Sequence, residues 1–258
     1  MSPRVSRTLP TVEPILLTPR SDPFADPAWL FEPKYDGYRG LLYVRRHRPV
    51  AVAGGLSFRQ VSVGFLHSCG VDAVTHKAFC WGSNALGRLG DGSTLKQRLR
   101  PFPVAGGRSF SQLSAGWDHT CAVTTGARAF CWGNGSNGQI GDGRTHQRWT
   151  PRAVAGGLGF TRVSAGVFHT CGETTNNLAY CWGVNTYGGL GDGTEIQRLR
   201  PVAVAGRLHF SQVSAGGFYS CGVTPGSAAY CWGYNFGGAL GDDTRTDRLT
   251  PVPVAGAM

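Results

Sequence analysis

The chain has 258 residues, of which 39 are Gly and 15 are Pro, and only 16% are charged. This composition excludes a helical bundle and favours many short strands joined by tight turns. No apolar run approaches the roughly 18 residues that a membrane-spanning helix needs, and no secretory signal is readable at the start of the sequence. The net charge of +10 makes a nucleic-acid or other polyanion partner an alternative to be weighed.

Residues 1–48 contain no internal repeat, and they include the sequence W-L-F-E-P-K-Y-D-G-Y-R-G-L-L-Y at Trp29–Tyr43. From about residue 12 to residue 44 the chain resembles the start of the nucleotidyltransferase domain of bacterial ATP-dependent DNA ligases, through its motif K-x-D-G-x-R. The resemblance implies that Lys34 would attack the α-phosphate of ATP. By the same resemblance, Glu32 would contact the adenine and Arg39 the ribose side.

Adenylation of Lys34 also needs a metal on the phosphates and further cations for the charge of the transition state. The ligase pattern stops after Val44, and neither a metal-binding carboxylate motif nor a downstream lysine pair follows. We therefore interpret residues 1–48 as a truncated DNA-ligase-like segment in a chimeric chain with no catalytic residue. ATP and a divalent metal are cofactors only under the alternative of an active ligase fragment.

Residues 49–258 form a second region, in which the sequence repeats about every fifty residues. The tripeptide Cys-Trp-Gly begins at Cys80, Cys131, Cys181 and Cys231, and Pro-x-x-Val-Ala-Gly begins at Pro49, Pro101, Pro151, Pro201 and Pro251. The region therefore holds four full repeats.

Within the second repeat, residues 110–115 read as a strand that ends in small residues, as suits crowding near a central axis. Residues 120–124 and 128–132 read as a hairpin around Gly126, residues 133–143 as an ordered loop, and residues 151–154 as an outer strand. Four short strands without a helix are typical of a propeller blade. We therefore predict an all-β fold, a partial or open β-propeller of four blades with a short non-propeller N-terminal extension.

The repeat resembles that of the regulator of chromosome condensation family from Pro49 to Ala257. The resemblance is carried by Ser-Ala-Gly before His119, Thr120 and Cys121, by Trp132-Gly133, and by Asn84 with Leu89-Gly90-Asp91-Gly92. It implies a β-propeller that is complete at seven blades. Four blades would then form an open arc, belong to a fragment, or be completed by a second chain.

The eight cysteines come in pairs, one pair per repeat. Across a hairpin centred on Gly126, residues 121 and 131 face each other at a separation that suits a disulfide. We predict the bridges Cys69–Cys80, Cys121–Cys131, Cys171–Cys181 and Cys221–Cys231. Buried reduced thiols are the alternative, as is zinc, because His67, His119 and His169 each precede a cysteine by two residues.

Other residues recur in phase with the repeat. The Asp residues in the glycine-flanked loops each supply one carboxylate, too few for calcium, and we expect them to stabilise turns with the repeat's Arg. We expect the Trp residues to pack between blades and the His residues to bind neighbouring backbone. The residues concerned are Asp91, Asp142, Asp192 and Asp242, Arg98, Arg148, Arg198 and Arg248, and Trp81, Trp132, Trp182 and Trp232. We predict no metal site.

These observations favour a non-enzymatic β-propeller scaffold whose loops bind an unidentified protein. The alternatives are a ligase fragment adenylated at Lys34 and a basic module that binds DNA or another polyanion, and self-association through open propeller ends is a further expectation. Paired cysteines suggest a secreted or cell-surface ancestry, whereas a ligase-like start suggests the cytoplasm, so the location stays open.

The ligase alternative is tested by incubating the protein with ATP and Mg²⁺ and measuring its intact mass. We expect no adenylyl adduct, because the motif supplies a nucleophile without its metal site. An adduct that disappears in Lys34→Ala, with Lys77→Ala as the control, would restore the enzyme alternative.

Overall fold

The computed structural model describes residues 29–30, 42–45, 48–49 and 55–256. The predicted ligase-site residues Glu32, Lys34 and Arg39 lie outside the described residues. Within residues 1–49, β1 (Trp29–Leu30), β2 (Leu42–Arg45) and β3 (Arg48–Pro49) form a small antiparallel sheet. No helix of the described part is long and apolar enough to cross a bilayer.

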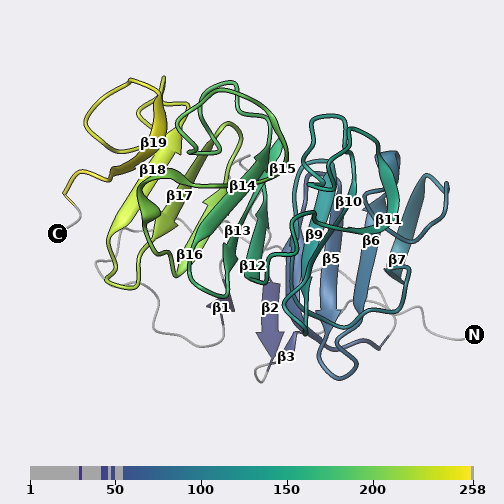
Figure 1. Cartoon of the computed structure of the whole chain (residues 1–258). Coiled ribbons are helices and arrows are strands. Elements are labelled where there is room, and N and C mark those ends of the chain that lie inside the picture. Colours follow the sequence, from purple (N-terminus) through teal and green to yellow (C-terminus); the bar gives the residue numbers. More distant parts are fainter. Residues whose placement is uncertain (1–28, 31–41, 46–47, 50–54, 257–258) are drawn as a thin grey trace, which may run out of the picture.

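The rest of the described chain forms four antiparallel sheets of four strands, each with its strands in chain order (Figure 1). The first and second blades are β4 (Phe58–Val63), β5 (His67–Asp72), β6 (Ala78–Ser83), β7 (Gln97–Pro103) and β8 (Phe110–Ala115), β9 (His119–Thr124), β10 (Ala129–Gly133), β11 (Arg148–Ala153). The third and fourth are β12 (Phe160–Ala165), β13 (His169–Thr174), β14 (Ala179–Gly183), β15 (Arg198–Ala203) and β16 (Gln212–Ala215), β17 (Tyr219–Val223), β18 (Ala229–Gly233), β19 (Arg248–Pro253). Two short 3₁₀ turns, η1 (Ala85–Gly87) and η2 (Ala205–Arg207), lie in the loops.

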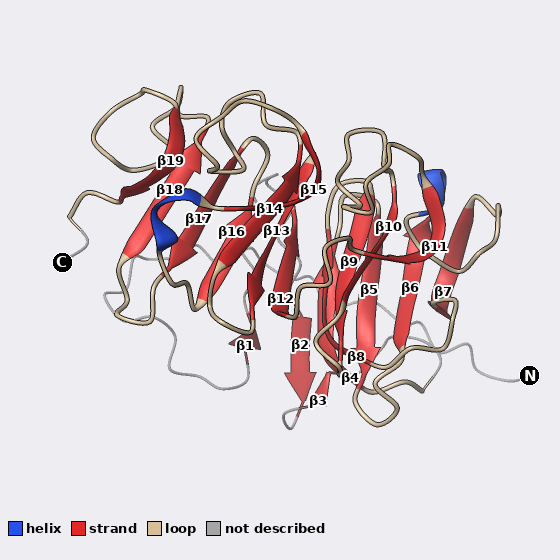
Figure 2. Cartoon of the chain, in the orientation of Figure 1, coloured by secondary structure: helices blue, strands red, loops and turns tan. Residues whose placement is uncertain are grey.

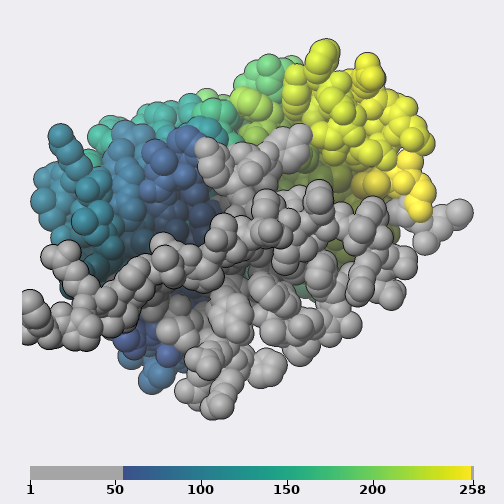
Figure 3. Space-filling model, turned by 180° about the vertical axis from the view of Figure 1, so that it is seen from behind, coloured from purple at the N-terminus to yellow at the C-terminus, as the bar shows by residue number. Residues whose placement is uncertain are grey.

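In Figure 2 the third and fourth blades stand side by side, and the strands of the second blade overlap those of the first. The core clusters join each blade to the next one in chain order. In the view from behind, the described surface passes from blue to yellow along the length of the molecule (Figure 3). Among the described strands no ladder joins the first sheet to the fourth. The predicted all-β, four-bladed open propeller is therefore confirmed.

The predicted strands of the second repeat match the structure closely at the inner strand and the hairpin. The outer strand differs, since it begins at Arg148, three residues before the predicted start at Pro151. The reason is a register shift after Cys131, which lets Gly133 pair with Arg148 and extends the ladder toward the loop.

Among the described residues the hydrophobic core is divided into three clusters, each between two neighbouring blades. The first cluster joins Val71 and Leu89 of the first blade to Phe110, Leu113 and Trp132 of the second. The other two clusters repeat this arrangement at the second and third junctions. Each blade thus buries its apolar residues against the next blade.

The repeat's tryptophan contacts the Gly-Asp loop of the preceding blade, as predicted. A Cβ atom added to Gly141 would lie 2.6 Å from the Trp182 ring, which is fully buried. Gly141 also has φ +76°, a conformation that favours glycine. In the first blade Trp81 is only half-buried, because none of the four blades precedes it.

Glycines at the ends of the inner strands allow the blades to approach closely near the axis. The N–H of Trp117 donates to Gly166 O at 3.1 Å. A Cβ atom at Gly116 would lie 2.5 Å from that same oxygen. The expected need for small residues at this position is confirmed.

Replacing Trp182 tests the inter-blade core. We expect Trp182→Ala to lower the free energy of unfolding by about 3–5 kcal/mol, as for other large buried aromatic residues. Trp81→Ala should cost much less, because Trp81 is half-buried and none of the four blades packs on it from the preceding side. Denaturant unfolding of both variants measures the difference, and equal losses would contradict the inter-blade role.

Candidate functional site

Each blade contains one disulfide at the centre of its second and third strands. The bridges are Cys69–Cys80, Cys121–Cys131, Cys171–Cys181 and Cys221–Cys231, with Cα–Cα distances of 4.0–4.1 Å. The ladder places the paired cysteines opposite each other, as the hairpin register predicted. Since every cysteine sulfur is bonded to another cysteine sulfur, none is a thiolate ligand for zinc.

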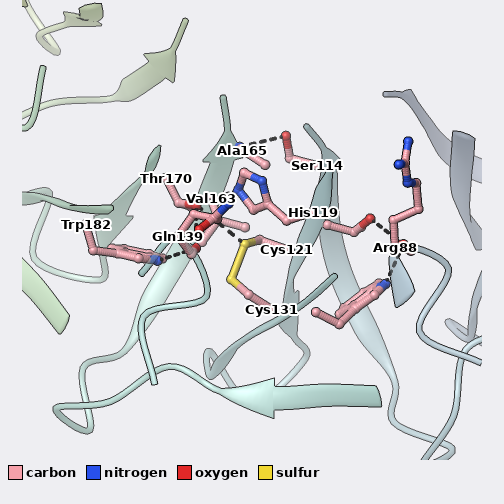
Figure 4. The surroundings of a disulfide bond; sticks show 12 residues. Arg88, Ser114, His119, Cys121, Cys131, Gln139, Val163, Ala165, Thr170 and Trp182 are labelled. Carbon is pink, nitrogen blue, oxygen red and sulfur yellow. Dashed lines mark hydrogen bonds between the residues drawn. A yellow bond between two sulfur atoms is a disulfide. The ribbon is translucent and has the colours of Figure 1, made fainter. Parts of the chain in front are cut away.

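The repeat's histidine links one blade to the next through a hydroxyl group (Figure 4). His119 Nε2 lies 2.8 Å from Thr170 Oγ1, and this hydroxyl donates to Gln139 O at 2.9 Å. Because the hydroxyl proton is used in that bond, Thr170 Oγ1 accepts a hydrogen bond from the N–H at His119 Nε2. Trp182 Nε1 donates to the same carbonyl oxygen at 2.9 Å.

The same network recurs at the other two junctions. The corresponding groups are His67, Thr120, Arg88 O and Trp132 at the first, and His169, Ser220, Gly189 O and Trp232 at the third. Burial lowers the pKa of His169 to about 4, so this imidazole is neutral near pH 7. We expected bonds to neighbouring backbone; His169 does bond the backbone of Gly217, and the side-chain hydroxyl on the next blade is a further partner that we did not expect.

The repeat's Asp and Arg form an ion pair inside each long loop. The pairs are Asp91–Arg98, Asp142–Arg148, Asp192–Arg198 and Asp242–Arg248. Asp242 also accepts from the Thr244 hydroxyl at 2.7 Å and from the Asn235 amide at 3.0 Å. The Thr244 hydroxyl, with Arg248 and Asn235, lowers the pKa of Asp242 to about 2. The predicted turn-stabilising role is therefore confirmed.

One face of the propeller carries exposed aromatic side chains. This loop face consists of the connections between first and second strands and between third and fourth strands, which are joined by backbone hydrogen bonds such as Tyr234 N to Phe218 O. At one end Phe65 stacks on Trp117 with ring centroids 3.7 Å apart. At the other end lies what we call the aromatic row: Phe168, Phe218, Tyr187, Tyr234 and Phe236.

The aromatic row spans loops from two blades. Tyr187 of the third blade contacts Phe218 and Tyr234 of the fourth, with centroids 5.4 and 4.8 Å apart. Phe236 is 74% exposed and Phe218 36% exposed. Sequence analysis did not identify the row, because its members come from separate loops that only blade packing brings together.

A cavity of 1120 Å³ runs along the inner strands, with Arg59, Arg162 and Trp117 in its lining. In its walls Gln60 and Gln112 each bridge to the next inner strand. Gln112 donates to Val163 O at 2.9 Å and accepts from Val163 N at 3.0 Å. A polar side chain thus replaces a β-ladder between inner strands.

The third junction departs from this pattern. Arg162 occupies the position of Gln112, and a guanidinium group cannot accept a hydrogen bond. Instead the carboxylate of Glu173 accepts from Val213 N. Glu173 is 1% exposed, and burial raises its pKa. The other blades have Val71, Val123 and Val223 at its ladder position.

A second, smaller cavity of 430 Å³ lies at the outer strand of the second blade and is lined by Asp142, Arg144, Arg148 and Arg152. Sequence analysis gave no sign of this cavity beyond the positive net charge of the chain. Its central Arg148 is already paired with Asp142. The cavity therefore offers less positive charge than its three arginines suggest.

A disulfide-stapled, four-stranded blade that repeats along the chain defines a β-propeller repeat protein. The Regulator of chromosome condensation (RCC1) repeat matches residues 76–123, 127–172 and 176–223, together more than half of the chain, and a second description of this repeat matches residues 110–139 and 160–188. The chain belongs to the RCC1 repeat family. The matched residues begin at 76, so the ligase-like resemblance of residues 12–44 stays a prediction.

Similar proteins share parts of this architecture. The chain is 38% identical over 88 residues to the ultraviolet-B receptor UVR8 of Arabidopsis thaliana (33% of this chain, 20% of the receptor). It is 31% identical over 100 residues to the probable E3 ubiquitin-protein ligase HERC4 of Homo sapiens (38% of this chain, 9% of HERC4). It therefore spans a fifth or less of these relatives.

Solved structures confirm the fold. Prp20p of Saccharomyces cerevisiae, studied for its binding to Gsp1p and histones, superposes with a TM-score of 0.70 at 20% identity, covering 80% of this chain and 52% of Prp20p. Human WBSCR16 gives a TM-score of 0.70 at 20% identity, covering 79% and 54%. The chain thus spans about half of each structure.

Restoring the repeat's pattern at the third junction should stabilise the protein. We expect Arg162→Gln with Glu173→Val to raise the free energy of unfolding at pH 7 by about 1–4 kcal/mol, because a buried carboxylate is replaced by an apolar side chain while Val213 N regains an amide acceptor. Glu173→Val alone leaves that N–H without its acceptor and should gain less or lose stability.

The gain should depend on pH. The folded pKa of Glu173 is raised above its ordinary value of 4.5, so its contribution to stability is lost as pH rises from that value through the folded pKa. The advantage of the double variant should therefore grow from pH 4 to pH 7. Urea unfolding at both values measures it, and a constant or shrinking advantage would contradict the assignment.

Proposed function

We propose that this protein is a non-enzymatic scaffold that binds another protein through its loop face. The observation that carries the proposal is the aromatic row, whose rings contact one another across two blades. Phe218 and Phe236 are exposed, and Phe168, Tyr187 and Tyr234 are half-buried. Exposed clusters of aromatic residues mark interaction sites, because Phe and Tyr supply large apolar contact areas. Tyr187 and Tyr234 also carry hydroxyl groups that can hydrogen-bond at the rim of an interface.

The framework beneath these loops supports binding at a low cost in entropy. The Asn235 side chain donates to Asp242 and accepts from Leu240 N, fixing the loop that holds Phe236. The backbone of Tyr234 is bonded to that of Phe218, which connects the two loops of the fourth blade. A surface that is ordered before binding loses little conformational freedom on association.

Proteins of similar fold offer an analogy. Yeast RCC1 (Prp20) has been crystallised with Kap60 bound, and it is 21% identical to this chain over a structure of which the chain covers 50%. That likeness shows the fold alone, so the proposal rests on the aromatic row of this chain.

The two alternatives receive less support. For the polyanion alternative, Arg98, Arg148, Arg198 and Arg248 are all paired with loop carboxylates, which reduces the positive charge that is free to contact phosphates. The ligase alternative stays a prediction, because Lys34 lies outside the described residues.

The proposal is tested with Phe218→Ala combined with Phe236→Ala, and with Val74→Ala as the matched control. Val74 is 82% exposed and lies in the turn between β5 and β6, on the opposite face from the loops. A photo-crosslinking residue at position 236 identifies the bound protein in cells, and titration of that purified protein follows. We expect the double variant to weaken binding about tenfold or more, and the control to bind like the parent.

Unfolding of both variants should match that of the parent, because the replaced rings are partly or largely exposed. Equal affinity of the double variant and the parent would contradict the assignment of the aromatic row. An affinity that falls in Val74→Ala instead would place the binding surface on the opposite face.

A further inference from the structure

The first and second internal junctions of the array are built from the same set of contacts near the axis, and the third keeps the contact between Ser164 Oγ and Ala215 N at 3.0 Å. At the first junction Gln60 donates to Leu113 O at 2.8 Å and accepts from Leu113 N at 2.9 Å. Ser62 Oγ accepts from Ala115 N at 3.0 Å. At the second junction Gln112 and Ser114 make the same contacts to Val163 and Ala165. The earlier blade thus presents side chains and the later blade presents backbone.

Farther from the axis, each junction fits an apolar side chain of the later blade against glycine of the earlier one. A Cβ atom at Gly138 would lie 2.6 Å from Leu199, and one at Gly188 would lie 2.5 Å from Leu249. The Gly-Asp loop receives the tryptophan in the same way, as Gly191 does for Trp232. A junction therefore has two complementary faces, a trailing face on the earlier blade and a leading face on the later one.

The fourth blade presents a trailing face that no described blade covers. Gln212 and Ser214, which correspond to Gln60 and Ser62, are exposed. Gly241 is also exposed, whereas its counterparts in the first three blades are buried. A Cβ atom at Gly238 would meet only Thr244 O, at 4.0 Å, so the place that Trp149, Leu199 or Leu249 fills at the other junctions is open.

The first blade presents the matching leading face. Leu99, which corresponds to Leu199 and Leu249, is 85% exposed. Val63, at the position of buried Ala115, is 42% exposed. Trp81 is half-buried, whereas the tryptophans of the later blades are fully buried. The first blade thus exposes the groups that would cover the trailing face of the fourth blade.

We propose that the leading face of the first blade packs against the trailing face of the fourth blade of a second copy, in the register of the internal junctions. In this interface Gln212 bridges to the backbone of Val61, and Ser214 accepts from Val63 N. Trp81 covers Gly241, and Leu99 fills the space beside Gly238. A second copy is the occupant because the same chain carries both halves of a junction that it already forms three times.

The interface is heterologous, since two different surfaces of the same chain meet. One junction between two copies leaves a leading and a trailing face exposed, which either meet each other or add a further copy. The protein should therefore associate with increasing concentration. The residues that define these faces are not members of the aromatic row, so failure of this proposal leaves the proposed function intact.

Two double variants test the proposal, each of which adds acidic groups to one face only. Val63→Glu with Leu99→Glu alters the leading face, and Gln212→Glu with Val223→Glu alters the trailing face, where Val223 is 41% exposed. All four side chains are exposed, so the blades should still fold. Ile196→Glu is the control, because Ile196 is 60% exposed in a loop that belongs to neither face.

Sedimentation of the full chain at concentrations on the order of 1 to 100 μM measures the association. We expect dimers or larger species for the parent and for the control, and monomers for each double variant alone. An equimolar mixture of the two double variants should form a dimer, because one variant keeps its trailing face and the other keeps its leading face. This dimer should not grow, because both of its remaining end faces carry the acidic substitutions. Matching thermal unfolding of the monomeric variants with dilute parent shows that they are folded.

Three results would overturn the proposal. A parent that stays monomeric over the whole range shows that the faces do not pair between copies. A double variant that still dimerises alone shows that like faces meet. A mixture that stays monomeric although the parent associates shows that the two faces are not partners.

Discussion

The structure depends on burial between blades. A single four-stranded blade has a disulfide at its centre but too few neighbours to cover its apolar face, so Val71 and Leu89 are buried only when Phe110 and Trp132 of the next blade pack on them. The hydrophobic effect therefore acts across the junctions, and the chain behaves as a one-dimensional array of nearest neighbours. Neighbouring blades can approach closely because glycines line their loops and the axis, and Gln side chains bridge their inner strands.

Polar groups inside the junctions give that packing its specificity. The successive hydrogen bonds from His119 to Thr170 and from Thr170 to Gln139 O give a buried imidazole, a hydroxyl and a loop carbonyl a partner each. A neighbour shifted along the junction would leave all three without partners, at a cost that exceeds the gain from loose apolar contact. The corresponding network at the third junction contains His169 and Gly189 O, which lie one and two residues along the chain from Phe168 and Tyr187 of the aromatic row.

Much of this architecture could be predicted from sequence because each element repeats. The facing positions of Cys121 and Cys131 fix the hairpin, and the spacing of Asp and Arg fixes the loop. Features that exist only between repeats could not be predicted in this way. Tyr187 and Phe218 are ordinary loop residues in the sequence, and they meet only because two blades pack. Glu173 could have been noticed, since it and Arg162 both depart from the repeat, but their connection appears only in the ladder.

The third blade has Arg162 and Glu173 where the other blades have Gln and Val, and this difference affects how neighbouring blades separate. The third junction differs from the other two in joining its blades through a buried carboxylate, so we expect it to open most readily. Because Cys221 and Cys231 are bridged within the fourth blade, we expect that blade to separate as a folded unit. Fluctuations should then be largest at this junction, next to the loops that carry Tyr187 and Phe218.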